Sequence, residues 1–132
     1  MTLEANVLRA QSLRSTPEGY EVDVHLAWYR SLPLSCVENI SIKIAGKEVP
    51  SEQMRVRYLN RSLRLDELGE LVDDWWFIQD PLTIDVACSD ASESGAEVEL
   101  EVELATRIPY VIIGPDMALV QRTRAIKEVT IQ

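Results

Sequence analysis

The chain's one histidine is the first place to look for catalytic chemistry. His25 follows Glu21 and Asp23 at alternating positions, so the three side chains would share one face of a strand. An imidazole and two carboxylates can bind a divalent metal, but a solvated strand face has the same composition. We take the second interpretation and predict no metal site. A Ser–His or Cys–His nucleophile would need the same histidine, and no nucleophile-elbow motif is present.

Acidic side chains are numerous, but their spacing does not predict catalysis. Between residues 97 and 104 glutamate alternates with Val or Leu. In a strand this pattern places four carboxylates on a solvated face and four apolar side chains in the core. Such a charged face can also block unwanted strand pairing. The chain has no glycine-rich phosphate loop and no Cys-x-x-Cys motif, so we predict no catalytic residue and no cofactor in it.

Aromatic residues and arginine gather at three places, each close to a proline in the sequence. These are the residue types that anchor protein interfaces. Because neighbours on a strand point to opposite faces, one residue of each adjacent aromatic pair must lie on a different face from its neighbour. We therefore predict an interface formed by Trp28, Tyr29, Arg30, Pro33, Trp75, Trp76, Arg107 and Tyr110.

Length and composition favour a single domain over residues 1–132. Thirteen Lys and Arg against 22 Asp and Glu give a net charge of −9, which repels nucleic-acid phosphates and anionic membranes. Two cysteines, Cys36 and Cys88, are too few for a disulfide framework, and we interpret them as free thiols. The sequence shows neither a signal peptide nor a membrane-spanning run. We expect a cytoplasmic protein whose partners include neither nucleic acid nor membrane.

Alternation of apolar and polar residues predicts an all-β fold. A proline after Arg107 is expected to end or kink the strand that begins near residue 98. The number and spacing of these segments favour an antiparallel β-sandwich or jelly-roll-like barrel of about eight short strands. Strands are expected at 7–13, 20–28, 40–44, 54–58, 82–86, 98–104 and 119–131, a turn at 45–47, at most one short helix at 63–71 and a loop at 89–95.

Four segments occur in order across the chain: WYRSLPLS from Trp28, GKEVP from Gly46, Trp76-Phe77 before Asp80, and RIPY from Arg107. Together they resemble the small β subunit of bacterial C-glycoside deglycosidases, also called C-deglycosylation enzymes. The resemblance covers most of the chain. The family pattern has a Gly-Glu-His-like turn before the glutamate-rich strand, where this sequence reads SGAE at 94–97. No role for that histidine is therefore carried over.

The resemblance implies a heteromeric carbon–carbon lyase. A larger α subunit, similar to sugar-phosphate isomerase barrels, would hold a divalent metal such as Mn²⁺ together with the catalytic His and acidic residues. The complex would cleave the bond between a 3-oxo-sugar and an aromatic aglycone, as in flavonoid C-glycosides, and this chain would be its non-catalytic β subunit. The alternative is a free-standing carbohydrate-binding β-sandwich, in which Trp75 or Trp76 stacks on sugar rings. A small standalone enzyme is disfavoured by the single histidine.

Overall fold

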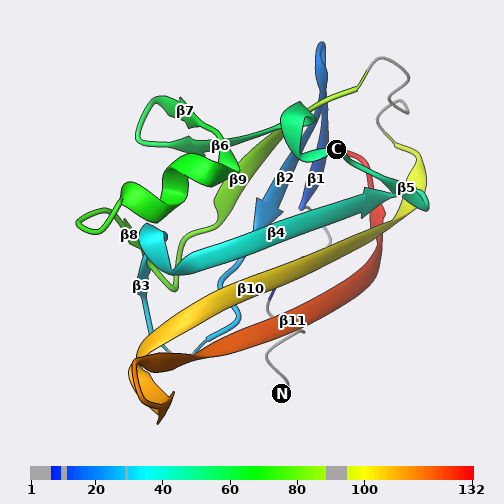
Figure 1. Cartoon of the computed structure of the whole chain (residues 1–132). Coiled ribbons are helices and arrows are strands. Elements are labelled where there is room, and N and C mark those ends of the chain that lie inside the picture. The colour runs from blue at the N-terminus through cyan, green and yellow to red at the C-terminus, as the bar shows by residue number, and fades with distance from the viewer. Residues whose placement is uncertain (1–6, 10–11, 29, 89–94) are drawn as a thin grey trace.

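The computed structural model describes residues 7–9, 12–28, 30–88 and 95–132, and antiparallel strands dominate it (Figure 1). The all-β class is confirmed. The described part contains more strands than the eight expected, and two of them are long. The elements are β1 (Leu13–Thr16), β2 (Gly19–Val24), β3 (Leu32–Pro33), η2 (Leu34–Cys36), β4 (Val37–Ile44), β5 (Lys47–Glu48), η3 (Ser51–Gln53), β6 (Met54–Tyr58), β7 (Arg61–Leu63), η4 (Leu65–Glu70), β8 (Trp75–Trp76), β9 (Leu82–Ala87), β10 (Glu97–Gly114) and β11 (Met117–Thr130).

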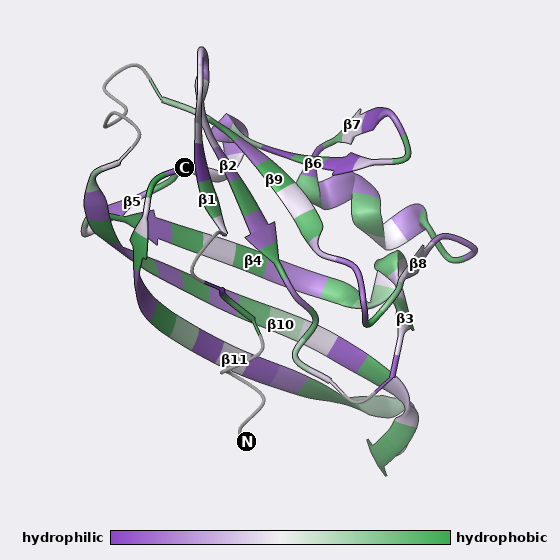
Figure 2. Ribbon diagram, turned by 180° about the vertical axis from the view of Figure 1, so that it is seen from behind, coloured by the Kyte–Doolittle hydropathy of each residue, from purple (hydrophilic) through white to green (hydrophobic). Residues whose placement is uncertain are grey.

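Two sheets form the layers of the molecule. The first has the strand order β1-β2-β9-β6-β7 and the second the order β11-β10-β4-β5, while β3 and β8 form a separate pair. Figure 1 shows the two larger sheets facing each other, with β3 and β8 at one end. Figure 2 shows hydrophobic and hydrophilic residues alternating along the strands. Because one face of each sheet is apolar, the core lies between the layers.

Apolar side chains from the two sheets fill this core. In the first sheet Ile84 of β9 lies opposite Val22 of β2 and Val56 of β6. In the second sheet Val102 of β10 lies opposite Ile42 of β4. None of these five side chains is exposed to solvent. Each stabilises the fold by about 1.5–3 kcal/mol through burial, so the apolar alternation that predicts the strands also supplies the core.

Several expected elements are confirmed. The segments expected at 40–44, 54–58, 82–86, 98–104 and 119–131 lie within β4, β6, β9, β10 and β11. The turn at 45–47 joins β4 to β5, and Ala45 and Gly46 have φ values of 53° and 79°, as a two-residue hairpin turn requires. The helix expected at 63–71 is the 3₁₀ helix η4; η2 and η3 are two further 3₁₀ segments, so the limit of one short helix is wrong.

The expectations for the first two strands are partly wrong. Residues 7–9 are not in a strand: Val7 and Leu8 are adjacent and both buried, which a strand with one solvated face does not allow. The second strand ends at Val24 rather than at residue 28. The residues after it, His25, Leu26 and Ala27, are all buried. The chain thus leaves the sheet here but stays within the core.

Strand β10 continues through Pro109 to Gly114. Its pairing with β4 ends where Thr106 lies opposite Val37. Its pairing with β11 changes register between Ile108 and Ile112. Because proline has no backbone N–H to donate, it interrupts the pairing of the strands. The expectation that β10 ends here is wrong, and the irregularity expected at the proline is present as a register shift.

Gly19 at the start of β2 is a position where only glycine fits. Its φ is +152°, and an added Cβ would lie 2.6 Å from the backbone nitrogen of Cys88 and closer still to the carbonyl oxygen of Val86. We predict that Gly19→Ala lowers the free energy of unfolding by about 2–4 kcal/mol through strain and overpacking, measured by urea unfolding. The control is Gly69→Ala, whose Cβ would meet nothing within 4 Å. Equal stabilities of the two variants would contradict this prediction.

Candidate functional site

Three of the predicted interface residues meet although they are distant in the sequence. The Trp28 indole Nε1 donates a hydrogen bond to the Tyr110 hydroxyl, across 82 residues of chain. The Arg30 guanidinium lies over the same tyrosine ring, 5.5 Å from its centroid, at the distance of a cation–π contact. The loop after β2 and the far part of β10 are thereby joined at one end of the molecule.

Strands β3 and β8 bring three further predicted residues to this end. Pro33 lies opposite Trp75, and Leu32 lies opposite Trp76. Trp76 is buried and its Nε1 donates to the backbone carbonyl of Asp80 at 3.0 Å, whereas 42% of Trp75 is exposed. The expectation that the two tryptophans face different ways is confirmed. Only Trp75 of the two presents its side chain to solvent; Trp76 belongs to the core.

Arg107, another predicted residue, makes a weaker contact. The Arg107 Nη1 atom lies 3.8 Å from a carboxylate oxygen of Glu38, and both side chains are well exposed. Such a surface ion pair contributes about 0–1 kcal/mol, so the arginine is available to a partner at little cost. Tyr29 lies outside the described residues.

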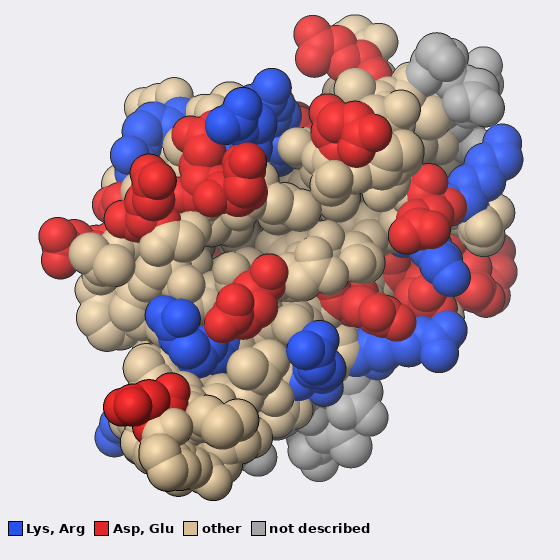
Figure 3. Space-filling model, viewed as in Figure 1, with Lys and Arg blue, Asp and Glu red and all other residues tan. Residues whose placement is uncertain are grey.

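Exposed apolar side chains that were not predicted surround this cluster. Phe77 and Ile78 follow β8, and the Ile78 backbone N–H donates to the Ser31 hydroxyl at 2.8 Å, next to Arg30. Further examples lie around the turn between β10 and β11. Figure 3 shows a largely uncharged surface at the lower left, where the turn between β10 and β11 lies, with an acidic side chain on it and further charged side chains around it. We call the following residues the apolar end: Trp28, Trp75, Phe77, Ile78, Tyr110, Ile112, Ile113 and Met117.

His25 is not part of a metal site in the described residues. Only 8% of it is exposed, and its Nδ1 atom has no hydrogen-bond partner. Glu21 and Asp23 instead bind the guanidinium of Arg14, at 3.0 and 2.7 Å. Nowhere in the described part of the chain do three His, Cys, Asp or Glu side chains gather closely enough to hold a metal ion. The expectation that His25 shares the strand face of the two carboxylates is wrong, because β2 ends before it.

The glutamate face of β10 is paired with basic residues of both neighbouring strands. Glu101 is buried and accepts from the Arg124 guanidinium at 2.6 Å, while the Lys43 ammonium lies 3.6 Å away. The hydrogen bond from Arg124 holds the pKa of Glu101 below its ordinary value. Glu97, Glu99 and Glu103 are exposed, as expected for a solvated face, whereas the expectation that Glu101 is also solvated is wrong.

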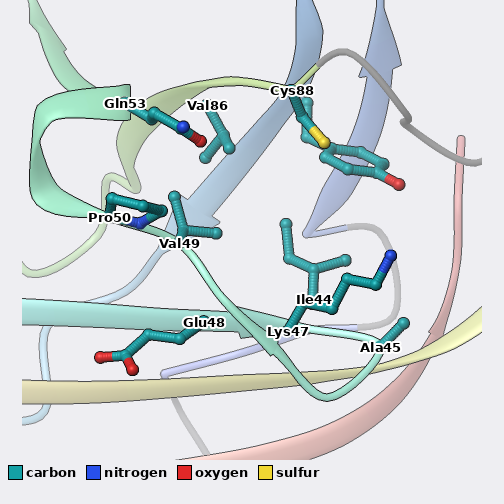
Figure 4. Close-up of a pocket in the computed structure, with 10 residues that line it drawn as sticks. Ile44, Ala45, Lys47, Glu48, Val49, Pro50, Gln53, Val86 and Cys88 are labelled. Atoms are coloured by element: carbon teal, nitrogen blue, oxygen red, sulfur yellow. The ribbon is translucent and has the colours of Figure 1, made fainter.

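A cavity of about 290 Å³ lies between the sheets, away from the apolar end (Figure 4). Its walls include Ile44, Val49, Pro50 and Val86, and Cys88 lies at its edge. Cys36 is buried and Cys88 is partly buried, and the two do not form a disulfide with each other. The volume lies at the lower limit of ligand pockets, about 300 Å³, and Trp75 does not line the cavity. It therefore gives no support to sugar stacking on that tryptophan.

Comparison with known proteins identifies the family. Residues 2–110 match the family model described as C-glycoside deglycosidase beta subunit. The chain belongs to this family. The resemblance noted in the sequence is therefore confirmed, and the match covers every predicted interface residue.

Individual deglycosidase beta subunits are similar to this chain over most of its length. A C-glycoside deglycosidase beta subunit of Microbacterium trichothecenolyticum is 36% identical over 109 residues, 82% of this chain and 81% of that protein. One from Arthrobacter globiformis is 30% identical over 115 residues, 87% of each. A 3′-dehydrocarminate deglycosidase beta subunit of a Microbacterium species is 28% identical over 128 residues, 94% of this chain and 96% of that protein. In the described residues no helix has the length and apolar character needed to cross a membrane.

The buried histidine makes stability depend on pH. Burial lowers the pKa of His25 from its ordinary 6.5, the charge of Arg9 lowers it further, and Asp23 opposes both. Below pH 6.5 the unfolded chain therefore binds more protons than the folded one, so stability falls as pH falls through this window. We predict that the urea midpoint decreases from about pH 7.5 to 5.5 and that His25→Gln reduces this decrease. The same decrease in both proteins would contradict the prediction.

Proposed function

We propose that this chain is the non-catalytic β subunit of a heteromeric C-glycoside deglycosidase. The observation that carries the proposal is the family match over residues 2–110. The complex cleaves the carbon–carbon bond between a 3-oxo-sugar and an aromatic aglycone, and it works in the cytoplasm. The chain's contribution is to bind and support a larger catalytic subunit rather than to supply reacting groups.

The chemistry of the reaction supports this division of labour. A carbon leaving group has no lone pair that a general acid could protonate, so a pair of carboxylates gains little. Oxidation of the sugar at C3 acidifies the neighbouring C–H, and a base together with a metal-stabilised enolate permits elimination. Such a site needs several metal ligands and a base. The described residues bring no such group together, so we place it, with a divalent metal such as Mn²⁺, in an isomerase-like barrel partner.

The apolar end supplies the surface for that partner. It combines exposed Trp, Tyr, Phe, Ile and Met side chains with the exposed side chains of Arg30 and Arg107. This is the composition of a protein interface core with cationic anchors. In a chain of net charge −9, a largely uncharged surface is the part that can be buried against another protein while desolvating few carboxylates.

One observation favours a second function. The 42% exposure of Trp75 would allow its ring to stack on a sugar, as in a free-standing carbohydrate-binding module. The two functions differ in what the chain binds alone. A β subunit copurifies with a large partner and binds no free sugar, whereas a carbohydrate-binding module retains sugar affinity without any partner.

The first prediction from this proposal concerns activity. The isolated chain is expected to release no aglycone from a 3-oxo-C-glucosyl flavonoid at any Mn²⁺ concentration, because its described residues do not gather a ligand set. Adding the catalytic subunit encoded in the same genome is expected to give turnover, measured as released aglycone by chromatography. Turnover by the pure chain that His25→Ala abolishes would contradict the proposal.

The second prediction concerns Arg30. We expect Arg30→Met to weaken binding to the catalytic subunit by about tenfold or more, with little change in melting temperature, because Arg30 is an exposed anchor that makes only a surface cation–π contact. The control is Arg55→Met on β6 of the first sheet, where an exposed arginine lies opposite Asp85 on β9. A lower melting temperature with unchanged affinity would instead assign Arg30 to the fold.

A further inference from the structure

The end of the β10–β11 hairpin is a two-stranded ribbon that extends beyond its sheet. Strand β4 pairs with β10 only as far as Thr106. The pair Ile108–Leu119 is the last regular one between β10 and β11, after which the register shifts twice. Figure 1 shows the two strands continuing past β3 and curling away from the sandwich. We call residues 109–118 the arm.

Both faces of the arm are apolar and open to solvent near its tip. Ile112 is 63% exposed and its neighbour Ile113 is 60% exposed. Since consecutive strand residues point to opposite faces, neither face of the ribbon rests on the sandwich at this point. Val111 is partly buried against the core, and Met117 across the turn is 58% exposed. An unbroken run of β-branched residues is typical of a strand that is covered on both faces.

The arm is fixed at its base. Tyr110 is the second residue of the arm. Its hydroxyl accepts the hydrogen bond from Trp28, and the Arg30 guanidinium lies over its ring. An isolated two-stranded ribbon is only marginally stable in water, so the base contacts fix the direction of a segment whose tip lacks its own support. A ribbon that is pre-positioned in this way loses less conformational entropy when it is bound.

The charges of the arm and its base indicate what covers it. Asp116 is the one charged residue in the arm, and no carboxylate in the described part of the chain forms an ion pair with Arg30 at its base. If the arm bound a second copy of this chain, two Arg30 side chains would face each other. Two chains that each have a net charge of −9 would also come into contact. The complementary surface is instead an apolar groove with an acidic rim on a different chain.

We propose that the arm inserts into such a groove on the catalytic subunit, with its apolar tip covered on both faces and Arg30 facing an acidic rim. This inference rests on the proposed function, and it identifies the arm as the element that binds the catalytic subunit. The arm is then the main anchor of the heteromer, and the rest of the apolar end packs around it.

The test measures binding of variant chains to the catalytic subunit encoded in the same genome, by surface plasmon resonance. We expect the double substitution Ile112→Ser and Ile113→Ser to weaken binding by at least about tenfold while leaving the melting temperature unchanged. Leu59→Ser, the same kind of change at a residue that is 73% exposed on the β6–β7 turn, is expected to change affinity by less than about twofold. Met117→Glu is a second arm variant in case the double variant does not fold.

Hydrogen exchange on the wild-type complex gives an independent measurement. Amides of residues 109–118 are expected to exchange more slowly in the complex, and those of the β6–β7 turn are not. If wild-type chain binds the catalytic subunit but arm variants bind equally well, or the arm amides are not protected, the inference is wrong and the proposed function stands. If the wild-type chain does not bind the catalytic subunit, the inference about the arm and the proposed function are both wrong. If the arm variants lose only self-association of the chain, the arm is covered by a second copy of this chain and the inference is wrong.

Discussion

The pairing of β10 with a strand on each side is the constraint on which the rest of the structure depends. Val102 at its centre lies opposite Ile42 on β4 and Ala125 on β11. The alternation of glutamate with apolar residues fixes this register, because a slip by one residue would bury a row of carboxylates. Arg124 and Lys43 reinforce the same register from the outer face through Glu101. With β10 held in this way, the position of its far end, and so of Tyr110, is also fixed.

The sequence predicts the elements of the sheets well where burial follows a period of two. Burial alternates over residues 40–44, 54–57 and 82–87, and strands β4, β6 and β9 lie where the pattern places them. The pattern fails where both neighbours are buried, as at Val7 and Leu8, since the same residues could belong to a strand or to an irregular segment over the core. It also fails at Pro109, because a ribbon without a third strand tolerates a residue that cannot donate to the ladder.

For the candidate site, the sequence predicts residue types better than positions. The rule that neighbours face opposite ways separates Trp75 from Trp76, but it cannot say which one is buried. The contact of Trp28 with Tyr110 joins residues 82 apart, and no local pattern encodes it. Ile112 and Ile113 lie in an apolar run that has the composition of a core strand. Only the end of the β4 pairing at Thr106 shows that nothing in the described chain covers them.

The fold extends beyond the part of the chain that the family model matches. The match ends at residue 110, yet the sheet needs β11, whose Val129 and Ala125 are buried in the core. An apolar position on an outer strand accepts several side chains of similar volume, so its sequence is weakly specified even when its burial is required. The base of the arm is different, because a hydrogen bond and a cation–π contact require Trp28, Arg30 and Tyr110 by chemical type. All three lie within the matched residues.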